Sequence, residues 1–169
     1  MHRQLFVIGK KNVVFQTHYN PNNYYQHLKT MEIFDPQVAY GTIDDNKAIS
    51  LIEMVRHGIE FEIFDKFAKK GPFSMNEWSS YLHLSERTMQ RYKIENRTFD
   101  PLQSEKIIEI ALLYNKGIEV FGKAEKFNSW LETENVALGK TKPKMLLDIS
   151  FGINLIFDEL GRIEYGVLA

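Results

Sequence analysis

A short run of polar residues, Ser85 to Lys93, has the residue types and the spacing that reading DNA requires. Arg87, Gln90 and Arg91 recur three and four residues apart in it, and residues at this spacing share one face of a helix. Arginine and glutamine are donors that pair with base edges in the major groove. A serine at the N-terminus of a helix can hold a phosphate. The run therefore predicts a DNA-recognition helix.

The residues before this run complete a helix-turn-helix pattern. Ser74 and Glu77 form a capping box that begins a short helix, and the segment from Leu82 to Leu84 makes a tight turn. Met89 and Tyr92 then face the core, which leaves the polar side chains outward. Arg87, Gln90 and Arg91 are expected to read bases, Thr88, Lys93 and Arg97 to lie nearer the DNA backbone, and Ser85 to contact a phosphate.

The alternative is a helical hairpin whose polar face is only solvated. From Leu84 to Lys106 five basic residues accompany four acidic ones, although phosphate contacts dominate the affinity of DNA-binding proteins. One copy of the chain should therefore bind DNA weakly, so we expect a homodimer. His83 stands where such a turn often has glycine, but histidine tolerates a left-handed backbone better than most residues.

No arrangement of residues in the sequence indicates catalysis, a cofactor or a metal. The histidines have no metal-ligand spacing such as HExxH, and Ser79-Ser80 has no glycine elbow around it. A glycine-rich phosphate loop is also absent. The pairs Glu60/Glu62 and Asp158/Glu159 are typical of solvated faces. We therefore expect a protein that is not an enzyme, with no catalytic, cofactor-binding or metal-binding residues.

The last residues of the chain stay apolar and aromatic, whereas chain ends usually become polar. Leaving Ile163, Tyr165 and Val167 in water forgoes roughly 1.5–3 kcal/mol for each large side chain that could be buried. The tail therefore either folds onto its own core or is kept for the surface of another protein.

Length and composition indicate an ordinary globular protein. The 169 residues make one large domain or two small ones, and 44% hydrophobic with 25% charged residues allows a packed core. A net charge of -1 argues against a chain wrapped in nucleic acid along its whole length. The absence of cysteine excludes disulfides and thiolate metal sites. Since no apolar run has the length of a signal sequence or a membrane span, we expect a cytoplasmic protein without membrane contact.

The elements that must position these features begin after a different N-terminal segment. Short β-branched or aromatic runs at Gln4 to Ile8 and Val13 to Gln16 flank a turn-like stretch, which predicts a β-rich extension with a hairpin over residues 1–43.

From Asp44 onward the pattern is helical. Asp100-Pro101 begins a helix that is apolar on several faces, so we expect it to be the central and most buried one. Gly117 inside it costs about 1 kcal/mol relative to alanine. Further helices are expected from Asp44 or Asp45 to Gly58, through Phe61 to Ala68, through Phe127 to Leu131, from Pro143 to Leu147, and near Ser150 to Leu160.

A series of separated short motifs shows a distinctive order along the second half of the chain. The motifs are Glu119-Val120-Phe121-Gly122, Trp130-Leu131, Asn135-Val136-Ala137-Leu138-Gly139, Pro143, Leu147, Gly152 and Leu160-Gly161-Arg162-Ile163-Glu164-Tyr165-Gly166-Val167. Together with the run from Leu84 to Arg91, they make the chain from about Asp45 onward resemble antitoxins of the Xre/MbcA/ParS class. Glu134 stands where that family often has proline, and Lys140 replaces a second glycine after Gly139.

The resemblance implies a mainly α fold with two domains behind the β-rich extension. An Xre-like helix-turn-helix bundle would occupy residues 44–100, and a small helical toxin-binding domain residues 101–169. Members of this class pair with a cognate toxin, commonly a RES-domain toxin that destroys NAD, and cover its active-site entrance. They also repress their own operon through operator DNA. The toxin-binding residues that the resemblance implies are Trp130, Leu138, Gly139, Pro143, Gly152, Leu160, Ile163, Tyr165, Gly166 and Val167.

Two functions remain open from the sequence. The first is an antitoxin of a type II toxin–antitoxin system that is also an autorepressor. The second is a stand-alone DNA-binding regulator whose C-terminal domain only dimerises. Under the first, we expect Leu160 and Ile163 to be held in the chain's own core, and Tyr165 to Ala169 to meet the toxin; under the second, Tyr165 and Val167 close the core or a homodimer interface.

Overall fold

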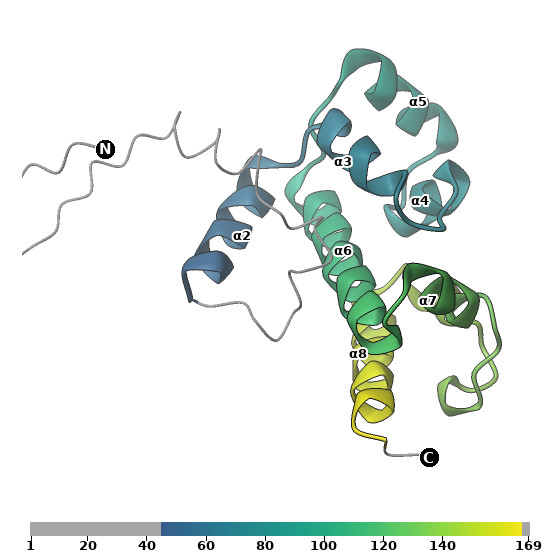
Figure 1. The fold of residues 1–169 in the computed structure, drawn as a ribbon. Coiled ribbons are helices and arrows are strands. Elements are labelled where there is room, and N and C mark those ends of the chain that lie inside the picture. Colours follow the sequence, from purple (N-terminus) through teal and green to yellow (C-terminus); the bar gives the residue numbers. More distant parts are fainter. Residues whose placement is uncertain (1–44, 167–169) are drawn as a thin grey trace, which may run out of the picture.

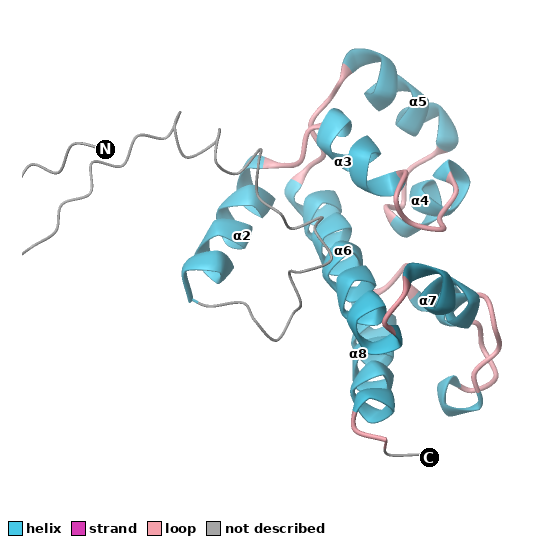
Figure 2. Ribbon diagram, viewed as in Figure 1, coloured by secondary structure: helices cyan, strands magenta, loops and turns pink. Residues whose placement is uncertain are grey.

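The computed structural model describes residues 45–166, with side chains from residue 48 onward. Within this part the chain forms seven α-helices and two short 3-10 helices, and β structure is limited to two isolated bridges (Figure 2). The expected mainly α fold is therefore confirmed. The predicted β-rich extension over residues 1–43 lies outside the described residues.

The helices follow one another with short connections. Their bounds are α2 Asp45–His57, α3 Phe61–Ala68, α4 Met75–Tyr81, α5 Glu86–Glu95, α6 Pro101–Phe121, α7 Ala124–Leu131, η3 Val136–Leu138, η4 Pro143–Leu146 and α8 Ser150–Glu164. None of the described helices combines the length and the apolar character that crossing a membrane requires.

Helix α6 is the central element, as the sequence predicted. Its start is fixed by a capping box in which the Asp100 side chain accepts from the Gln103 amide and the Gln103 side chain accepts from the Asp100 amide. Helices α2, α7 and α8 all pack against it, and Figure 1 shows it between the helix-turn-helix and the C-terminal helices. Ten of its 21 residues are buried, so it carries core residues for both halves of the molecule.

Gly117 in the middle of α6 has a packing reason. A Cβ atom built on it would lie 2.2–2.4 Å from ring atoms of Phe127 in α7. The glycine therefore lets the Phe127 ring, which is fully buried, approach the α6 backbone. This close approach accounts for a residue that weakens the helix by itself.

An aromatic cluster forms the core of the N-terminal half. Trp78 of α4 is fully buried, and its ring meets those of Phe64, Phe67 and Phe73 edge-on at centroid distances of 5.0–5.7 Å. Phe99, just before α6, adds a further edge-on contact to Phe64. Edge-to-face rings at these distances stabilise a core beyond the area they bury, and this core fixes α3 and α4 on each other.

Helix α8 lies along α6, and the two helices run parallel. Near the start of α8, Ser150 bonds with Lys106 and Glu109, and near its end Glu164 bonds with Lys116. Its core-facing side follows helical spacing with Gly152, Ile153, Ile156 and Leu160.

Helix α8 ends at Glu164, four residues beyond the end that the sequence suggested. Gly161 lies inside this helix and does not adopt the left-handed backbone with which glycine commonly ends a helix. That conformation occurs later, at Gly166.

Candidate functional surfaces

Helix α5 presents the predicted DNA-reading side chains on one exposed face. The Ser85 hydroxyl accepts from the Thr88 amide at 3.1 Å and so caps the helix, and Met89 is buried beneath it. Arg87, Gln90 and Arg91 are all exposed. The turn that leads into α5 has His83 at φ 52°, the left-handed conformation in which such turns often have glycine and which histidine tolerates.

The remaining predicted DNA-binding residues lie around this face. Lys93 is exposed near the end of α5, and Thr88 is half-buried with its hydroxyl 2.9 Å from that of Ser85. Arg97 follows the helix, with its guanidinium over the Tyr92 ring at 5.4 Å. The structure thus gathers all seven residues on α5 and its two ends, while the Ser85 hydroxyl is already engaged in the cap.

The exposed face of α5 also carries an apolar residue that the sequence analysis did not single out. Ile94 is 83% exposed and lies seven residues after Arg87. Residues at such a spacing share a face of the helix, so Ile94 continues the line of the side chains predicted to read DNA. Sequence periodicity alone indicated only that Ile94 does not belong to the core stripe of Met89 and Tyr92.

Several residues predicted to bind the toxin are held inside the chain's own core. Leu138, Pro143, Gly152 and Leu160 are buried. A Cβ atom on Gly152 would lie 2.1 Å from the Leu146 carbonyl oxygen, so this glycine allows η4 to pack on α8. These residues shape the C-terminal domain and have little surface of their own to offer a partner.

Trp130 is half-buried and belongs to an aromatic group. Its ring stacks on that of Phe127 at 5.7 Å and lies 5.6 Å from that of Phe121. The indole therefore helps to join α7 to the end of α6, and only part of it faces solvent.

The other predicted toxin-binding residues lie at the surface. Gly139 is exposed and ends η3 at φ 70°, and Gly166 is exposed beyond α8. Tyr165 is 80% exposed, and Ile163 is 37% exposed. Leu160 is fully buried as expected, whereas Ile163 is exposed and does not belong to the core, so the expectation that both are held in the chain's own core is wrong for Ile163. Val167 lies outside the described residues.

One exposed stripe of α8, which begins with two apolar residues and continues with two charged ones, was not predicted from the sequence. Phe151 is 87% exposed and Leu155 is 39% exposed, and Asp158 and Arg162 follow at the spacing of one helix face. We call these four residues the outer stripe of α8. The signal was present in the sequence, because Phe151 is out of phase with the buried set of Ile153, Ile156 and Leu160. Further exposed apolar residues in this domain are Val136, Met145 and Ile149.

The sequence suggested that Asp158 and Glu159 both lie on a solvated face, and the structure corrects this for one of the two residues. Asp158 is exposed as expected, but Glu159 is only 8% exposed and bonds with Arg162 at 2.5 Å. The two residues point to different sides because neighbours in a helix are about 100° apart.

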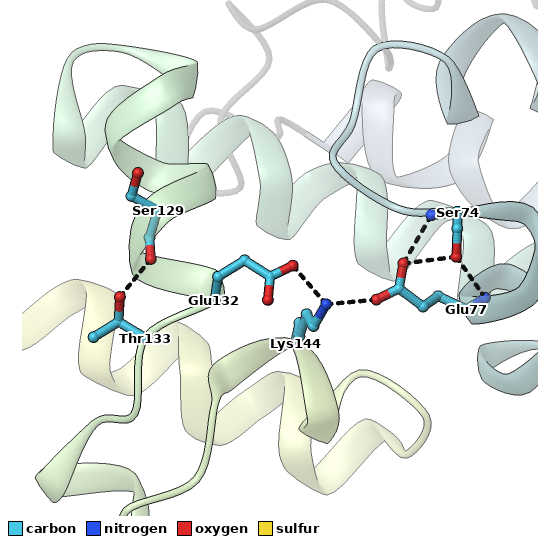
Figure 3. Close-up of polar contacts among 6 residues, drawn as sticks. All are labelled: Ser74, Glu77, Ser129, Glu132, Thr133 and Lys144. Carbon is cyan, nitrogen blue, oxygen red and sulfur yellow. Dashed lines mark hydrogen bonds and ion pairs between the residues drawn. The ribbon is translucent and has the colours of Figure 1, made fainter.

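One lysine joins the two halves of the molecule. Lys144 of η4 lies 2.7 Å from Glu77 of α4 and 2.5 Å from Glu132 after α7 (Figure 3). The other oxygen of Glu77 accepts from the amide and the hydroxyl of Ser74, which completes the predicted capping box. Glu77 therefore starts α4 and binds the C-terminal half at the same time. We call Glu77, Lys144 and Glu132 the Lys144 bridge.

The contact between Glu77 and Lys144 favours the charged form of both side chains. Burial raises the pKa of Glu77, but hydrogen bonds from Lys144 and Ser74 and the charge of Lys144 outweigh it, so the pKa of Glu77 lies below its ordinary value of 4.5. Hydrogen bonds to Glu132 and Glu77 hold the pKa of Lys144 above its ordinary value of 10.5. Burial, together with nearby carboxylates, raises the pKa of Tyr81 beside the bridge. These shifts keep Glu77 and Lys144 charged near neutral pH.

The described residues contain no group of three or more histidine, aspartate or glutamate side chains placed to hold a metal ion. The candidate surfaces are a donor-rich helix face on α5, and apolar and aromatic residues along and beyond α8.

Comparison with known proteins places both surfaces in named domains. The antitoxin Xre-like helix-turn-helix domain matches residues 50–112, and the antitoxin Xre/MbcA/ParS C-terminal toxin-binding domain matches residues 116–166. The chain is similar to the antitoxin Xre of Yersinia enterocolitica, with 23% identity over 120 residues, 70% of this chain and 81% of that protein. A crystal structure of the MbcT-MbcA toxin-antitoxin complex of M. tuberculosis matches with 14% identity and a TM-score of 0.47, over 75% of this chain and 100% of that one.

The two matched domains follow each other in the order that the sequence predicted and together account for most of the described residues. The chain belongs to the Xre/MbcA/ParS family of antitoxins, with a helix-turn-helix domain and a toxin-binding domain.

Proposed function

We propose that the outer stripe of α8 and the residues just beyond it form the surface that binds the toxin. The observation that carries this proposal is the exposure of two aromatic side chains, Phe151 and Tyr165, at opposite ends of a helix within the matched toxin-binding domain. Protein interfaces concentrate their binding energy in a few aromatic and aliphatic anchors. Phe151, Leu155 and Tyr165 are such anchors, and Asp158 and Arg162 supply polar contacts at the rim.

The proposal extends to the class of toxin and the way it is blocked. We propose that the toxin has a RES domain and degrades NAD, and that Tyr165, Gly166 and Val167 cover its active-site entrance. Support comes from the family resemblance and from the exposed end of α8, where Tyr165 and Gly166 follow the last helical turn. Both an NAD-degrading toxin and operator DNA are met in the cytoplasm, where we propose that the chain acts.

A truncation designed on the structure tests the blocking step. A stop after Glu164 removes residues 165–169 but keeps all of α8 and the Glu164–Lys116 ion pair at 2.9 Å. Co-expression with the toxin should then fail to rescue growth, and cellular NAD should fall. Circular dichroism of the purified truncated chain controls for folding. Full neutralisation by a folded truncated chain would exclude a role for the tail, and toxicity with unchanged NAD would exclude the NAD-degrading class.

The outer stripe is tested separately by Phe151→Ala. Since Phe151 is proposed as an interface anchor, replacing it with alanine should weaken the free energy of toxin binding by about 2–4 kcal/mol. Leu102→Ala is the matched control, because Leu102 is 78% exposed but lies at the start of α6 and not on the outer stripe of α8. Calorimetric titration of the toxin with both variants measures the difference. Equal affinities of the two variants would place the toxin elsewhere.

We also propose that α5 represses the operon of the chain by binding operator DNA. Arg87, Gln90 and Arg91 read bases, while Thr88, Lys93, Arg97 and the N-terminus at Ser85 contact the DNA backbone. Exposure of the three base-reading side chains on one helix face supports this assignment. We keep residues 44–100 as the proposed DNA-binding domain and residues 101–169 as the proposed toxin-binding domain. Because the local charge is nearly balanced, we propose that a homodimer supplies enough phosphate contacts.

A charge-matched pair of variants tests the DNA proposal. Arg87→Ala with Arg91→Ala removes two charges from α5, and Lys123→Ala with Lys126→Ala removes two charges from the start of α7. Each base-reading arginine should contribute roughly 1–3 kcal/mol to the free energy of operator binding. Fluorescence anisotropy with DNA from the promoter of the chain's own gene should show a large loss for the first pair and a small one for the second. Similar losses for both pairs would exclude specific reading by α5.

A stand-alone regulator remains the second candidate function. The outer stripe of α8 favours it to the extent that an exposed Phe151 and Leu155 also suit self-association. In that case Phe151→Ala would convert a dimer to a monomer in light scattering and weaken DNA binding, and no toxin gene would neighbour this one. Under the antitoxin proposal the same variant keeps its oligomeric state and loses the toxin.

A further inference from the structure

Ile94 is the most exposed aliphatic side chain of the recognition helix, at 83% exposure. A β-branched residue is also a weaker helix former than the lysine or glutamate common at solvated positions. Single exposed apolar residues are ordinary on protein surfaces, so exposure alone says little. The position of Ile94 on α5 is what gives it meaning.

Ile94 completes a helix face that otherwise consists of donors. Arg87, Gln90, Arg91 and Ile94 stand at positions i, i+3, i+4 and i+7 of α5, and the first three are exposed like Ile94. Side chains at these positions form one continuous stripe. The recognition helix of homeodomains places its base-contacting residues at the same four relative positions. Ile94 is therefore placed to enter the same groove as the three donors.

The major groove offers one apolar group for such a side chain to meet. The C5 methyl of thymine is the only methyl among the base edges there, and apolar side chains contact it. The neighbours of Ile94 on α5 do not compete for it: Lys93 is a cation suited to phosphate, and the Glu95 carboxylate lies 3.7 Å from the Arg97 guanidinium. Burial against the methyl would remove the Ile94 side chain from water.

We propose that Ile94 contacts the C5 methyl of a thymine in each operator half-site and thereby determines specificity for that base pair. This inference rests on the proposed DNA binding by α5. The helix geometry also places the base. Seven residues of α-helix span about 10.5 Å, which corresponds to about three base-pair steps at 3.4 Å per step. The thymine should therefore lie about three base pairs from the base that Arg87 reads.

Deoxyuridine scanning tests the contact directly, because deoxyuridine differs from thymidine only in lacking the C5 methyl. Footprinting first defines the half-site in the promoter of the chain's own gene. Each thymine in it is then replaced singly by deoxyuridine, and affinity is measured by anisotropy at fixed salt. For the full chain, one position in each half-site should lose about three- to fivefold in affinity, the effect of one buried methyl group.

The variant Ile94→Ala completes a double-mutant cycle with the deoxyuridine duplex. Its affinity for the thymine duplex should fall, and its affinity should no longer depend on the methyl at that position. Leu102→Ala, another exposed apolar truncation, should keep the deoxyuridine profile of the unmodified chain. Because Ile94 is exposed, the alanine variant should fold normally, and circular dichroism checks this.

Two results would overturn the inference while DNA binding by α5 stands. One is tight promoter binding with no thymine position that responds to deoxyuridine. The other is an Ile94→Ala variant that keeps the profile of the unmodified chain. If the unmodified chain fails to bind promoter DNA at low salt even with the toxin present, the proposed repression itself is wrong, and the role of Ile94 with it.

Discussion

Gly117 and Gly161 stand inside long helices, and their surroundings differ. At Gly117 a Cβ atom would lie 2.2 Å from the Phe127 ring, whereas at Gly161 nothing lies within 4 Å of such an atom. Alanine is the better helix former at both places by about 1 kcal/mol. The net effect of an alanine substitution on stability therefore depends on whether neighbouring atoms can move away from the added methyl group. The buried Phe127 ring has little freedom to do so.

We predict opposite effects of alanine at these two positions. Gly117→Ala should lower the free energy of unfolding by about 1–3 kcal/mol, because the added methyl overpacks the junction of α6 and α7. Gly161→Ala should raise it by about 0.5–1 kcal/mol, because helix propensity acts there without a clash. Urea unfolding followed by circular dichroism measures both. A stabilising Gly117→Ala would show that Phe127 can be displaced at low cost.

Single residues also show what the sequence can and cannot reveal. The capping box of Ser74 and the helix start at Asp100-Pro101 were predicted correctly, because each depends on a few neighbouring residues. The burial of Glu159 was not predicted, because it depends on how α8 is rotated against α6. The exposed Phe151 was missed as well, although its position out of phase with Ile153, Ile156 and Leu160 indicates that it faces away from the core.

At the scale of elements, the Lys144 bridge holds η4 between α4 and the end of α7. Lys144 is only 18% exposed and contacts two carboxylates from different parts of the chain. We predict that Lys144→Met lowers the free energy of unfolding by about 1–2 kcal/mol, since it removes charge-assisted hydrogen bonds and leaves Glu77 unpaired. Lys126→Met, at an exposed position of α7, is the control and should change it by less than about 0.5 kcal/mol. Equal effects would mean that the bridge adds nothing measurable.

The same bridge predicts how stability depends on pH. The pKa of Glu77 is lower in the folded chain than its ordinary value of 4.5, so the folded state binds this proton less readily than the unfolded chain. The resulting stability is present above pH 4.5 and is lost as the pH falls through the lowered pKa. Glu77→Gln keeps a side chain that can cap α4 but removes the charge.

Urea unfolding between pH 3 and pH 7 should therefore show Glu77→Gln less stable than the unmodified chain at neutral pH, with a difference that shrinks as the pH falls. Glu134→Gln, at an exposed loop position, serves as the control. A difference that stays constant over this range would mean that the Glu77 charge does not contribute.

Elements were predicted better than their surfaces. The order and type of the helices follow from caps and apolar spacing, and the central position of α6 follows from apolar residues on several of its faces. The end of α8 was predicted four residues too early, at Leu160, although the helix continues through Gly161 to Glu164. The buried side of α8 follows the helical spacing of Ile153, Ile156 and Leu160, whereas the exposed Phe151 on the opposite side was overlooked.

At the scale of the whole molecule, α6 makes the two matched domains depend on each other. The match to the helix-turn-helix domain ends at residue 112 and the match to the toxin-binding domain begins at residue 116, both within α6. Buried residues before that point, such as Ile107, and after it, such as Gly117, belong to one continuous helix. A helix cannot unfold in one half without exposing the core that it shares with the other.

We therefore predict that the described part of the chain unfolds in a single cooperative transition, although it contains two matched domains. The two tryptophans allow a test in the full chain, because Trp78 reports on the core around α4 and Trp130 on the packing of α7. The variant Trp130→Phe leaves Trp78 as the fluorescent probe, and Trp78→Phe leaves Trp130. In each variant, urea unfolding followed by fluorescence should have the same midpoint as unfolding followed by circular dichroism. Comparing two probes within one variant removes the effect of the substitution on stability. A fluorescence midpoint that differs from the circular dichroism midpoint would show that one half unfolds alone, and that α6 does not make the two halves cooperative.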